Sequence, residues 1–243
     1  MIKLIKLELV KNKLSAYLLA SLCILIFGIG FCFMTAFIPQ LDNLNGAIPP
    51  SVNVTLFYDW SNFISIISVL FAAAFSVLSA VMHTKFTVDE YTGKKAILLF
   101  SYPQSKSKIL FAKCVLVFFF TIIGAVVCNI AAVGIFAVCS NAFNIMIQPF
   151  NATMIPDLLA KSGISALLAA SAGIISMRVG FWKKSLVATV VTSFLLIAPF
   201  GNIISLFPEH SIEVHLIGMG ILLAMGLLIF IELLSKVNKM EAL

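Results

Sequence analysis

Charged side chains are scarce in this sequence. Asp, Glu, Lys and Arg together make up 11% of its 243 residues, whereas hydrophobic residues make up 61%. An ordinary soluble domain has about 25% charged and roughly 45–50% apolar residues. A water-soluble fold could not hide this much apolar surface, so the composition excludes a soluble domain and indicates an integral membrane protein.

The signatures of common enzymes are also missing. There is no HExxH or GxSxG motif, the three histidines stand apart, and the five cysteines lack the close Cys/His spacing of a zinc site. A Walker A loop is missing too, because Val88 stands where the first glycine of GxxxxGK[ST] would precede Gly93 and Lys94. We therefore expect no catalytic residue, metal or cofactor in this chain, and nucleotide would have to bind another subunit.

Six long apolar runs make up most of the sequence. Each is long enough to cross the hydrocarbon core, which requires about 20 helical residues. The runs cover about residues 14–38, 60–82, 109–139, 158–177, 186–207 and 214–234. The sequence therefore predicts an all-α membrane protein with six transmembrane helices in one domain, 1–243. Because Pro199 and Gly201 interrupt the fifth run, its end is either a short re-entrant helix or a kinked continuation of the span.

The basic residues fall almost entirely in alternate gaps between these runs. Fifteen of the 16 Lys and Arg residues lie on one side of the predicted membrane, and Lys161 lies on the other. The positive-inside rule places the basic side, and with it both the N- and the C-terminus, in the cytoplasm. This distribution explains the net charge of +6 without a nucleic-acid-binding surface, so no nucleic acid is expected as a partner.

The first 13 residues have the pattern of a helix that lies on the membrane surface. Apolar residues recur there at i, i+3 and i+7, and lysines occupy another face, which suits an anionic leaflet. The lysines of this predicted interfacial helix are Lys3, Lys6 and Lys13. The alternative is that these lysines only set the orientation of the first span.

Small residues recur along one face of the second run and along one face of the fourth. Such stripes permit close approach of two helix backbones. They are Ser68, Ala72 and Ser76 in the second run, and Ser165, Ala169 and Gly173 in the fourth. One interpretation is that they line a pore or a dimer interface. The alternative is that they serve ordinary packing within the chain.

Among the acidic residues, only Glu232 lies inside an apolar run. It is one turn from the predicted cytoplasmic end, where it can reach water or Lys236 at i+4. A proton-coupled carrier would usually bury more charge than this.

The longest predicted cytoplasmic gap, residues 83–108, has the features of a structured segment and not only of a connecting loop. Asp89 and Glu90 open an amphipathic stretch, where carboxylates suit the N-terminal end of a helix. The apolar patch 97–100 follows, and Pro103 ends it because the residue before a proline is pushed away from helical geometry.

This gap resembles the segment between spans two and three of the type-2 ATP-binding-cassette (ABC) permeases. Many members of that family have an acidic residue there, a glycine three positions on, a Leu-Leu pair, a proline, a cluster of small and basic residues, and a lysine that opens span three. The matching residues here are Glu90, Gly93, Leu98, Leu99, Pro103, the cluster 105–108 and Lys113. Lys94 departs from the pattern, since many members have threonine at that place.

The resemblance implies that Glu90, Gly93, Leu98, Leu99 and Pro103 belong to a coupling helix that sits in a cleft of a separate ATPase subunit. The chain would then be the permease subunit of an ABC exporter in a bacterial-type cell membrane. Two copies of an ABC ATPase would bind ATP and Mg, and a second permease, identical or related, would complete the path through the lipid bilayer. An amphipathic or hydrophobic peptide, such as a toxin or antimicrobial peptide, is the expected substrate. The alternatives are a self-contained channel or secondary carrier, and a membrane scaffold without transport.

Overall fold

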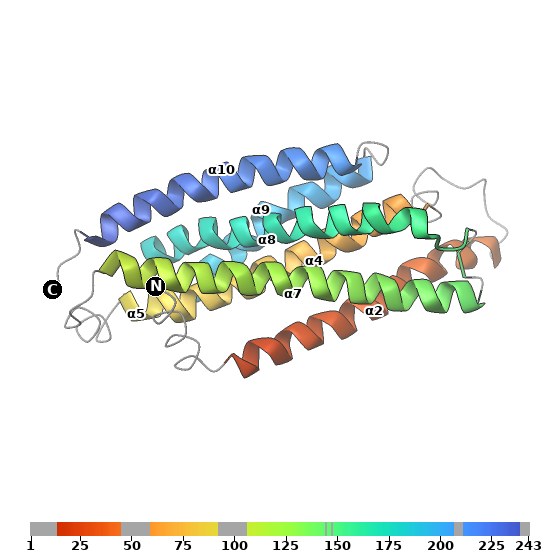
Figure 1. Ribbon diagram of the computed structural model, residues 1–243, viewed down its shortest axis with the longest axis horizontal. Helices are drawn as coiled ribbons and strands as arrows, with labels where there is room; N and C mark the ends of the chain where they lie inside the picture. The colour runs from red at the N-terminus through yellow and green to blue at the C-terminus, as the bar shows by residue number, and fades with distance from the viewer. Residues whose placement is uncertain are drawn as a thin grey trace.

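The protein is a bundle of long helices. The computed structural model describes residues 14–44, 59–91, 106–143, 145–146, 148–206 and 211–238. Consecutive long helices run in opposite directions along the long axis of the bundle (Figure 1). In the described part of the chain, the helices long and apolar enough to cross a membrane are α2 (Ser15–Leu44), α4 (Trp60–His83), α7 (Lys106–Phe143), α8 (Ile155–Lys183), α9 (Leu186–Leu206) and α10 (Ser211–Asn238). The predicted all-α class with six spans is confirmed.

Three short elements extend or precede these helices. A π-helical turn and a short α-helix continue α4 without a break, and a 3-10 turn leads into α8. They are η1 (Thr84–Val88), α5 (Asp89–Tyr91) and η2 (Ala152–Met154). The bundle therefore has an α5 end and an η2 end, which lie at opposite ends of its long axis (Figure 1).

Local sequence explains several helix boundaries. The Asp59 side chain accepts a hydrogen bond from the backbone N–H of Ser61 and so caps the start of α4. Pro156 stands in the first turn of α8, where its missing N–H costs nothing. Lys184, with a φ of 48°, ends α8 in the left-handed conformation. The fifth span is one continuous helix through Pro199, so the structure places no re-entrant segment within α9.

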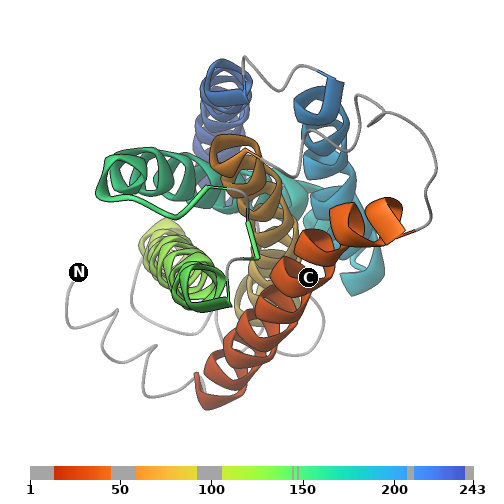
Figure 2. The same cartoon turned by 90° about the vertical axis from the view of Figure 1, so that its right-hand side faces the viewer.

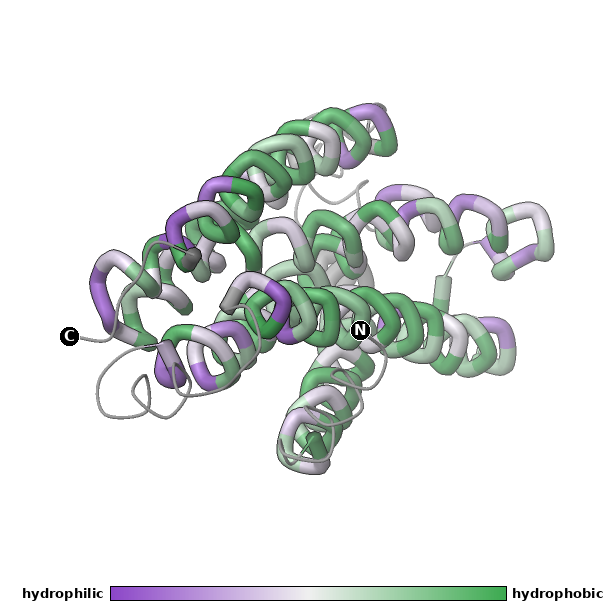
Figure 3. Tube along the Cα trace, turned by 60° about the vertical axis from the view of Figure 1, so that its left-hand side comes forward, coloured by the Kyte–Doolittle hydropathy of each residue, from purple (hydrophilic) through white to green (hydrophobic). Residues whose placement is uncertain are grey.

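Helix α4 passes through the middle of the bundle (Figure 2), and α4 and α8 are the most buried of its helices. In their most apolar stretches 61% and 67% of residues are buried, against 17% in α9 and 22% in both α2 and α10. The outer helices leave large apolar side chains exposed, among them Leu19, Phe27 and Leu228. Hydrophilic residues gather mainly towards the helix ends (Figure 3). This arrangement suits a bundle whose outer face contacts lipid.

Two apolar cores lie at different depths of the bundle. The larger one includes the ring pair Phe63 and Phe136, whose centroids are 4.8 Å apart, and Trp60, which donates a hydrogen bond to the Gln148 carbonyl at 2.8 Å. The smaller one, named here the second core, lies at the α5 end. It consists of Val88, Tyr91, Leu110, Cys114, Met177, Leu233 and Val237. The second core therefore joins η1 and α5 to α7, α8 and α10.

Candidate functional site

The base of the predicted coupling segment is built into the bundle. Glu90, its described member, lies in α5 and has a side chain that is 13% exposed. The Glu90 carboxylate pairs with the ammonium of Lys113 on α7, whose side chain is 1% exposed. The other predicted coupling and interfacial residues lie outside the described residues: Gly93, Leu98, Leu99, Pro103, Lys3, Lys6 and Lys13.

The Lys113 ammonium also holds the backbone of the π-helical turn. It donates a hydrogen bond to the Phe86 carbonyl oxygen at 2.8 Å, and both groups are buried. A π-helical turn bonds i to i+5 and breaks the regular ladder of the helix it interrupts; such turns often occur at functional sites. Lys113 therefore contacts two points at the start of the predicted coupling segment: the backbone of Phe86 just before it, and the side chain of Glu90, its first residue.

The second core fixes the same base by apolar contact. Val88 and Tyr91 pack there with Leu110 and Cys114 of α7, and the Tyr91 ring meets the Phe181 ring edge-on with centroids 6.1 Å apart. The chain thus leaves the membrane bundle from a position held on three sides rather than from a free helix end.

A second ion pair at the α5 end joins α8 to α10. The Arg178 guanidinium donates to both carboxylate oxygens of Glu232, at 2.6 and 3.4 Å. The sequence pattern had suggested Lys236, four residues further along the same helix, as the partner. The structure pairs Glu232 with Arg178 across 54 residues because the two helices pack side by side.

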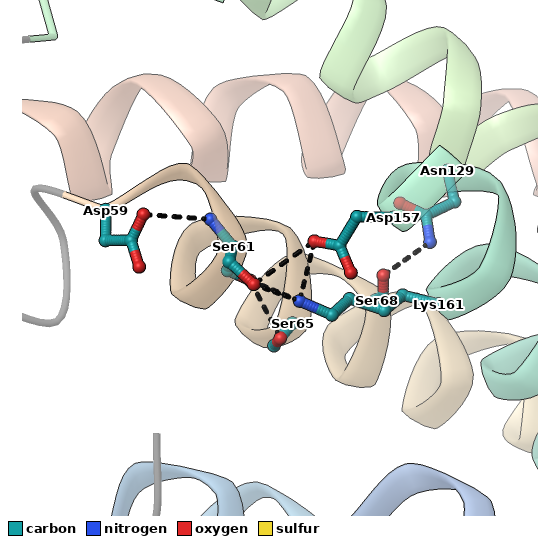
Figure 4. A network of polar contacts seen from close by, with 7 residues as sticks. All are labelled: Asp59, Ser61, Ser65, Ser68, Asn129, Asp157 and Lys161. Atoms are coloured by element: carbon teal, nitrogen blue, oxygen red, sulfur yellow. Dashed lines mark hydrogen bonds and ion pairs between the residues drawn. The ribbon is translucent and has the colours of Figure 1, made fainter. Parts of the chain in front are cut away.

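At the η2 end, Lys161 is the centre of a polar network (Figure 4). The Lys161 side chain is 1% exposed, and its ammonium donates to the Ser61 carbonyl at 2.8 Å, the Ser61 hydroxyl at 2.6 Å and the Asp157 carboxylate at 2.8 Å. The one basic residue that the sequence places opposite all others is therefore neutralised and bonded inside the protein. It ties the first turn of α8 to the first turn of α4.

The small residues predicted to line a pore or a dimer interface are buried between helices of this one chain. All six belong to α4 or α8, and they are Ser68, Ala72, Ser76, Ser165, Ala169 and Gly173. The Ser68 hydroxyl accepts a hydrogen bond from the Asn129 amide of α7 at 2.9 Å. They serve close packing within the chain, and their role at a pore or a dimer interface stays a prediction.

Beside this seam lies a row of buried polar groups on α4 and η1. The side chains of Ser79, His83 and Thr87 have no hydrogen-bond partner within the described residues. A buried polar group without a partner costs about 1–3 kcal/mol. Separation of α4 and α8 here, with entry of water, would remove that cost.

An apolar groove runs along α4 between α2 and α9. It consists of two adjoining hollows of about 300 and 430 Å³ that share Leu70, Ala73 and Phe194. Phe31 of α2 and Gly201 of α9 form part of its walls, and every residue that lines it is apolar. Such a surface can hold lipid chains, another apolar helix face or the apolar part of a passing molecule.

None of these features forms a metal site in the described ranges. There, no group of three or more His, Cys, Asp or Glu side chains is placed to hold a metal ion. The five cysteines, Cys23, Cys32, Cys114, Cys128 and Cys139, are free thiols. The arrangement consists of ion pairs, packed seams and an apolar groove.

Comparison with known proteins identifies the class. A sequence model described as ABC-2 family transporter protein matches residues 4–199, which is most of the chain. The chain belongs to this family, and it is therefore a membrane permease subunit of an ABC transporter, integral to the cell membrane and not a catalytic subunit. The family normally works with an ABC ATPase subunit.

A curated relative covers a similar length. The uncharacterized protein YcbO of Bacillus subtilis (strain 168) is 24% identical over 194 residues, which span 80% of this chain and 81% of the relative. No solved structure matches the chain at a significant level.

Proposed function

We propose that this chain is the permease subunit of an ATP-driven exporter. Two permeases, identical or related, form the translocation path, and two ATPase subunits that bind ATP and Mg dock on the α5 end, which faces the cytoplasm. The coupling segment, from Glu90 to Pro103, is the docking element. Closure of the ATPase dimer pushes this segment and switches the spans between inward-open and outward-open states.

The observation that carries the proposal is the anchored base of the coupling segment. A loop that only connects two spans needs no buried ion pair at its start, because burial of charge is costly without compensation. Here Glu90 is bonded to Lys113 inside the bundle, and Tyr91 packs in the second core. A force applied to this segment therefore reaches α7, α8 and α10 through direct contacts.

The apolar groove supports an amphipathic or hydrophobic peptide as the substrate class. Its lining carries no charged or hydroxyl side chain, so it favours the apolar face of a peptide over a sugar or an ion. Toxin and antimicrobial peptides have such faces.

Co-purification in mild detergent with the candidate ATPase tests the docking element. The purified chain alone should not hydrolyse ATP, and the complex should. Replacing Leu98 and Leu99 by Asp puts two charges into an interface whose centre should be apolar. Burial of an unpaired charge costs several kcal/mol, and about 1.4 kcal/mol is already tenfold in affinity, so the double variant should lose the ATPase while it still inserts and expresses.

A matched control adds the same number of charges elsewhere at the α5 end. Trp182 and Ser235 are exposed there, and the variant with Asp at both positions should keep the ATPase. Retention of the ATPase by the Leu98 and Leu99 variant would contradict the docking role of the segment. If no ATPase associates with the unaltered chain, a self-contained channel or carrier, or a scaffold without transport, becomes the better description.

A further inference from the structure

Lys113 is a buried cation that bonds to the base of the coupling segment. It lies in the second turn of α7, with Leu110 and Cys114 of the second core on either side along the helix. Its side chain is 1% exposed, and its ammonium bonds to the Phe86 carbonyl and the Glu90 carboxylate. Burial of an ammonium carries a desolvation cost of several kcal/mol, which needs such bonds to offset it.

The π-helical turn explains why a cation is placed at this point. A change from i+4 to i+5 bonding shifts the register of the backbone, and a carbonyl at such a turn can turn outward to another donor. Lys113 supplies that donor for Phe86 in η1. The same ammonium holds Glu90 in the next element, so one side chain fixes both the turn and the residue that opens the coupling segment.

The other ion pairs among the described residues do not connect the coupling segment to a spanning helix. Lys85 and Asp89 form an exposed pair within one helical stretch, and Lys161 lies at the η2 end. Arg178 and Glu232 join α8 to α10. In the described part of the chain, the pair of Lys113 and Glu90 is the one that joins a spanning helix to the base of the coupling segment.

We propose that Lys113 is a positioning residue that locks η1 and Glu90 to α7, so that a displacement of the coupling segment moves α7 with it. This inference rests on the proposed function. Without the ammonium, the coupling segment still docks through its apolar patch, but its displacement is taken up by the π-helical turn and does not reach α7. The variant complex then hydrolyses ATP without moving the bundle.

The movement of α7 can be measured in the complete complex of permease and ATPase in lipid nanodiscs. One spin label is placed at position 138 of α7, which is 72% exposed, and another at position 203 of α9, which is 38% exposed. Both positions lie towards the η2 end. No described side chain of α9 belongs to the second core, so α9 serves as the reference. Distances are compared without nucleotide and with ATP plus vanadate, in a background without native cysteines.

We expect a nucleotide-dependent change of distance in the unaltered complex. Lys113→Met should remove more than half of that change while ATP hydrolysis by the complex continues, and Lys113→Arg should restore it. Glu90→Gln, which keeps the shape and removes the charge, should reproduce the loss and remains informative if Lys113→Met does not fold. Because the two residues act as one unit, the double variant should lose no more than either single variant.

Arg178→Met removes the neighbouring ion pair and should leave the distance change intact. The inference is overturned if Glu90→Gln or Lys113→Met retains the full change, or if the unaltered complex shows no change. If Lys113→Met lowers ATP hydrolysis and the distance change together, Lys113 has only a structural role, and this result also overturns the inference. Failure of the unaltered chain to bind any ATPase refutes the proposed function first, so co-purification separates the two failures.

Discussion

At the scale of single residues, Gly173 of α8 lies against Ser79 of α4 with no space for a side chain. A Cβ atom at Gly173 would stand 2.1 Å from the Ser79 hydroxyl oxygen and 2.8 Å from the Ser79 Cβ. The hydroxyl can rotate away, but the Cβ cannot. The contact therefore depends on glycine because the backbone of α8 approaches α4 too closely for any other residue.

Gly173→Ala should destabilise the protein by about 1–3 kcal/mol, because overpacking forces α4 and α8 apart. The measurement is the apparent melting temperature in detergent. Gly163 is the matched control on the same helix, since a Cβ there meets nothing within 4 Å. Gly163→Ala should be neutral or stabilising by up to about 1 kcal/mol. Equal melting temperatures for the two variants would show that the seam has room to relax.

Glu90 shows how a residue's environment changes its expected contribution. A carboxylate at the start of a helix contributes about 0.3–1 kcal/mol to stability through its interaction with the helix dipole. The structure instead makes Glu90 the counterion of a buried ammonium. Removal of one partner of a buried pair typically costs about 3–5 kcal/mol, so Glu90→Ala should be more disruptive than its sequence position suggests.

At the scale of elements, Lys161 fastens α4 to α8 at the η2 end. Its ammonium joins Ser61, in the first turn of α4, to Asp157, in the first turn of α8. The two helices also pack along their small residues, but this end has no other described ion pair between them. Loss of the ammonium should therefore loosen the start of both helices.

We expect Lys161→Met to lower the apparent melting temperature clearly, because the break of a buried pair costs about 3–5 kcal/mol. The Asp157 carboxylate is 28% exposed, which allows water to offset part of that cost. Lys85→Met is the control, since Lys85 and Asp89 are 52% and 38% exposed and such pairs contribute about 0–1 kcal/mol. If both variants melt alike, the buried network contributes no more than a surface pair.

At the scale of the whole molecule, the charge distribution predicts the orientation of the bundle. Asn151, directly before η2, and Lys236, in the last turn of α10, are both exposed. The last turn of α10 lies at the end of the bundle opposite η2 (Figure 1). In cells that produce a chain without native cysteines, a cysteine at position 151 should react with an impermeant reagent from outside. A cysteine at position 236 should react only after permeabilisation.

The physical reason is that Lys and Arg are retained on the cytoplasmic side during insertion. Positions 45 and 94 provide a second test in the gaps between spans, with reaction expected at 45 and protection at 94. Labelling of position 236 in intact cells, with position 151 protected, would contradict the orientation and with it the cytoplasmic docking of an ATPase.

The number and order of the spans could be predicted from the sequence because hydropathy is a local property. Each run is apolar enough to be assigned without knowledge of its neighbours, and all six appear as helices. The helix ends were harder to predict: α7 continues to Phe143 and α8 begins at Ile155, beyond the apolar runs. Polar residues extend these helices because backbone hydrogen bonding continues after hydropathy falls.

The stripes of small residues could be found in the sequence, but their partner could not. The sequence is equally consistent with Ser68 and Ser165 in a pore, in a dimer interface or in an internal seam. A stripe of small residues indicates that another helix lies close, but it does not identify that helix. The structure buries both within α4 and α8, with Ser68 bonded to Asn129 of α7. The helix faces that pack together depend on the crossing angles between helices, and the sequence of one helix does not determine these angles.

The sequence by itself therefore determined a six-span membrane protein, its distribution of charge and its resemblance to the ABC permeases, since each of these depends on residues that are close together in the chain. Only the tertiary structure decided the pairs of Lys113 with Glu90, Lys161 with Ser61 and Arg178 with Glu232. The partners are 23, 100 and 54 residues apart. A buried charge has to be paired, but its partner is chosen by the packing of helices, and that packing is the sum of many contacts along the whole chain.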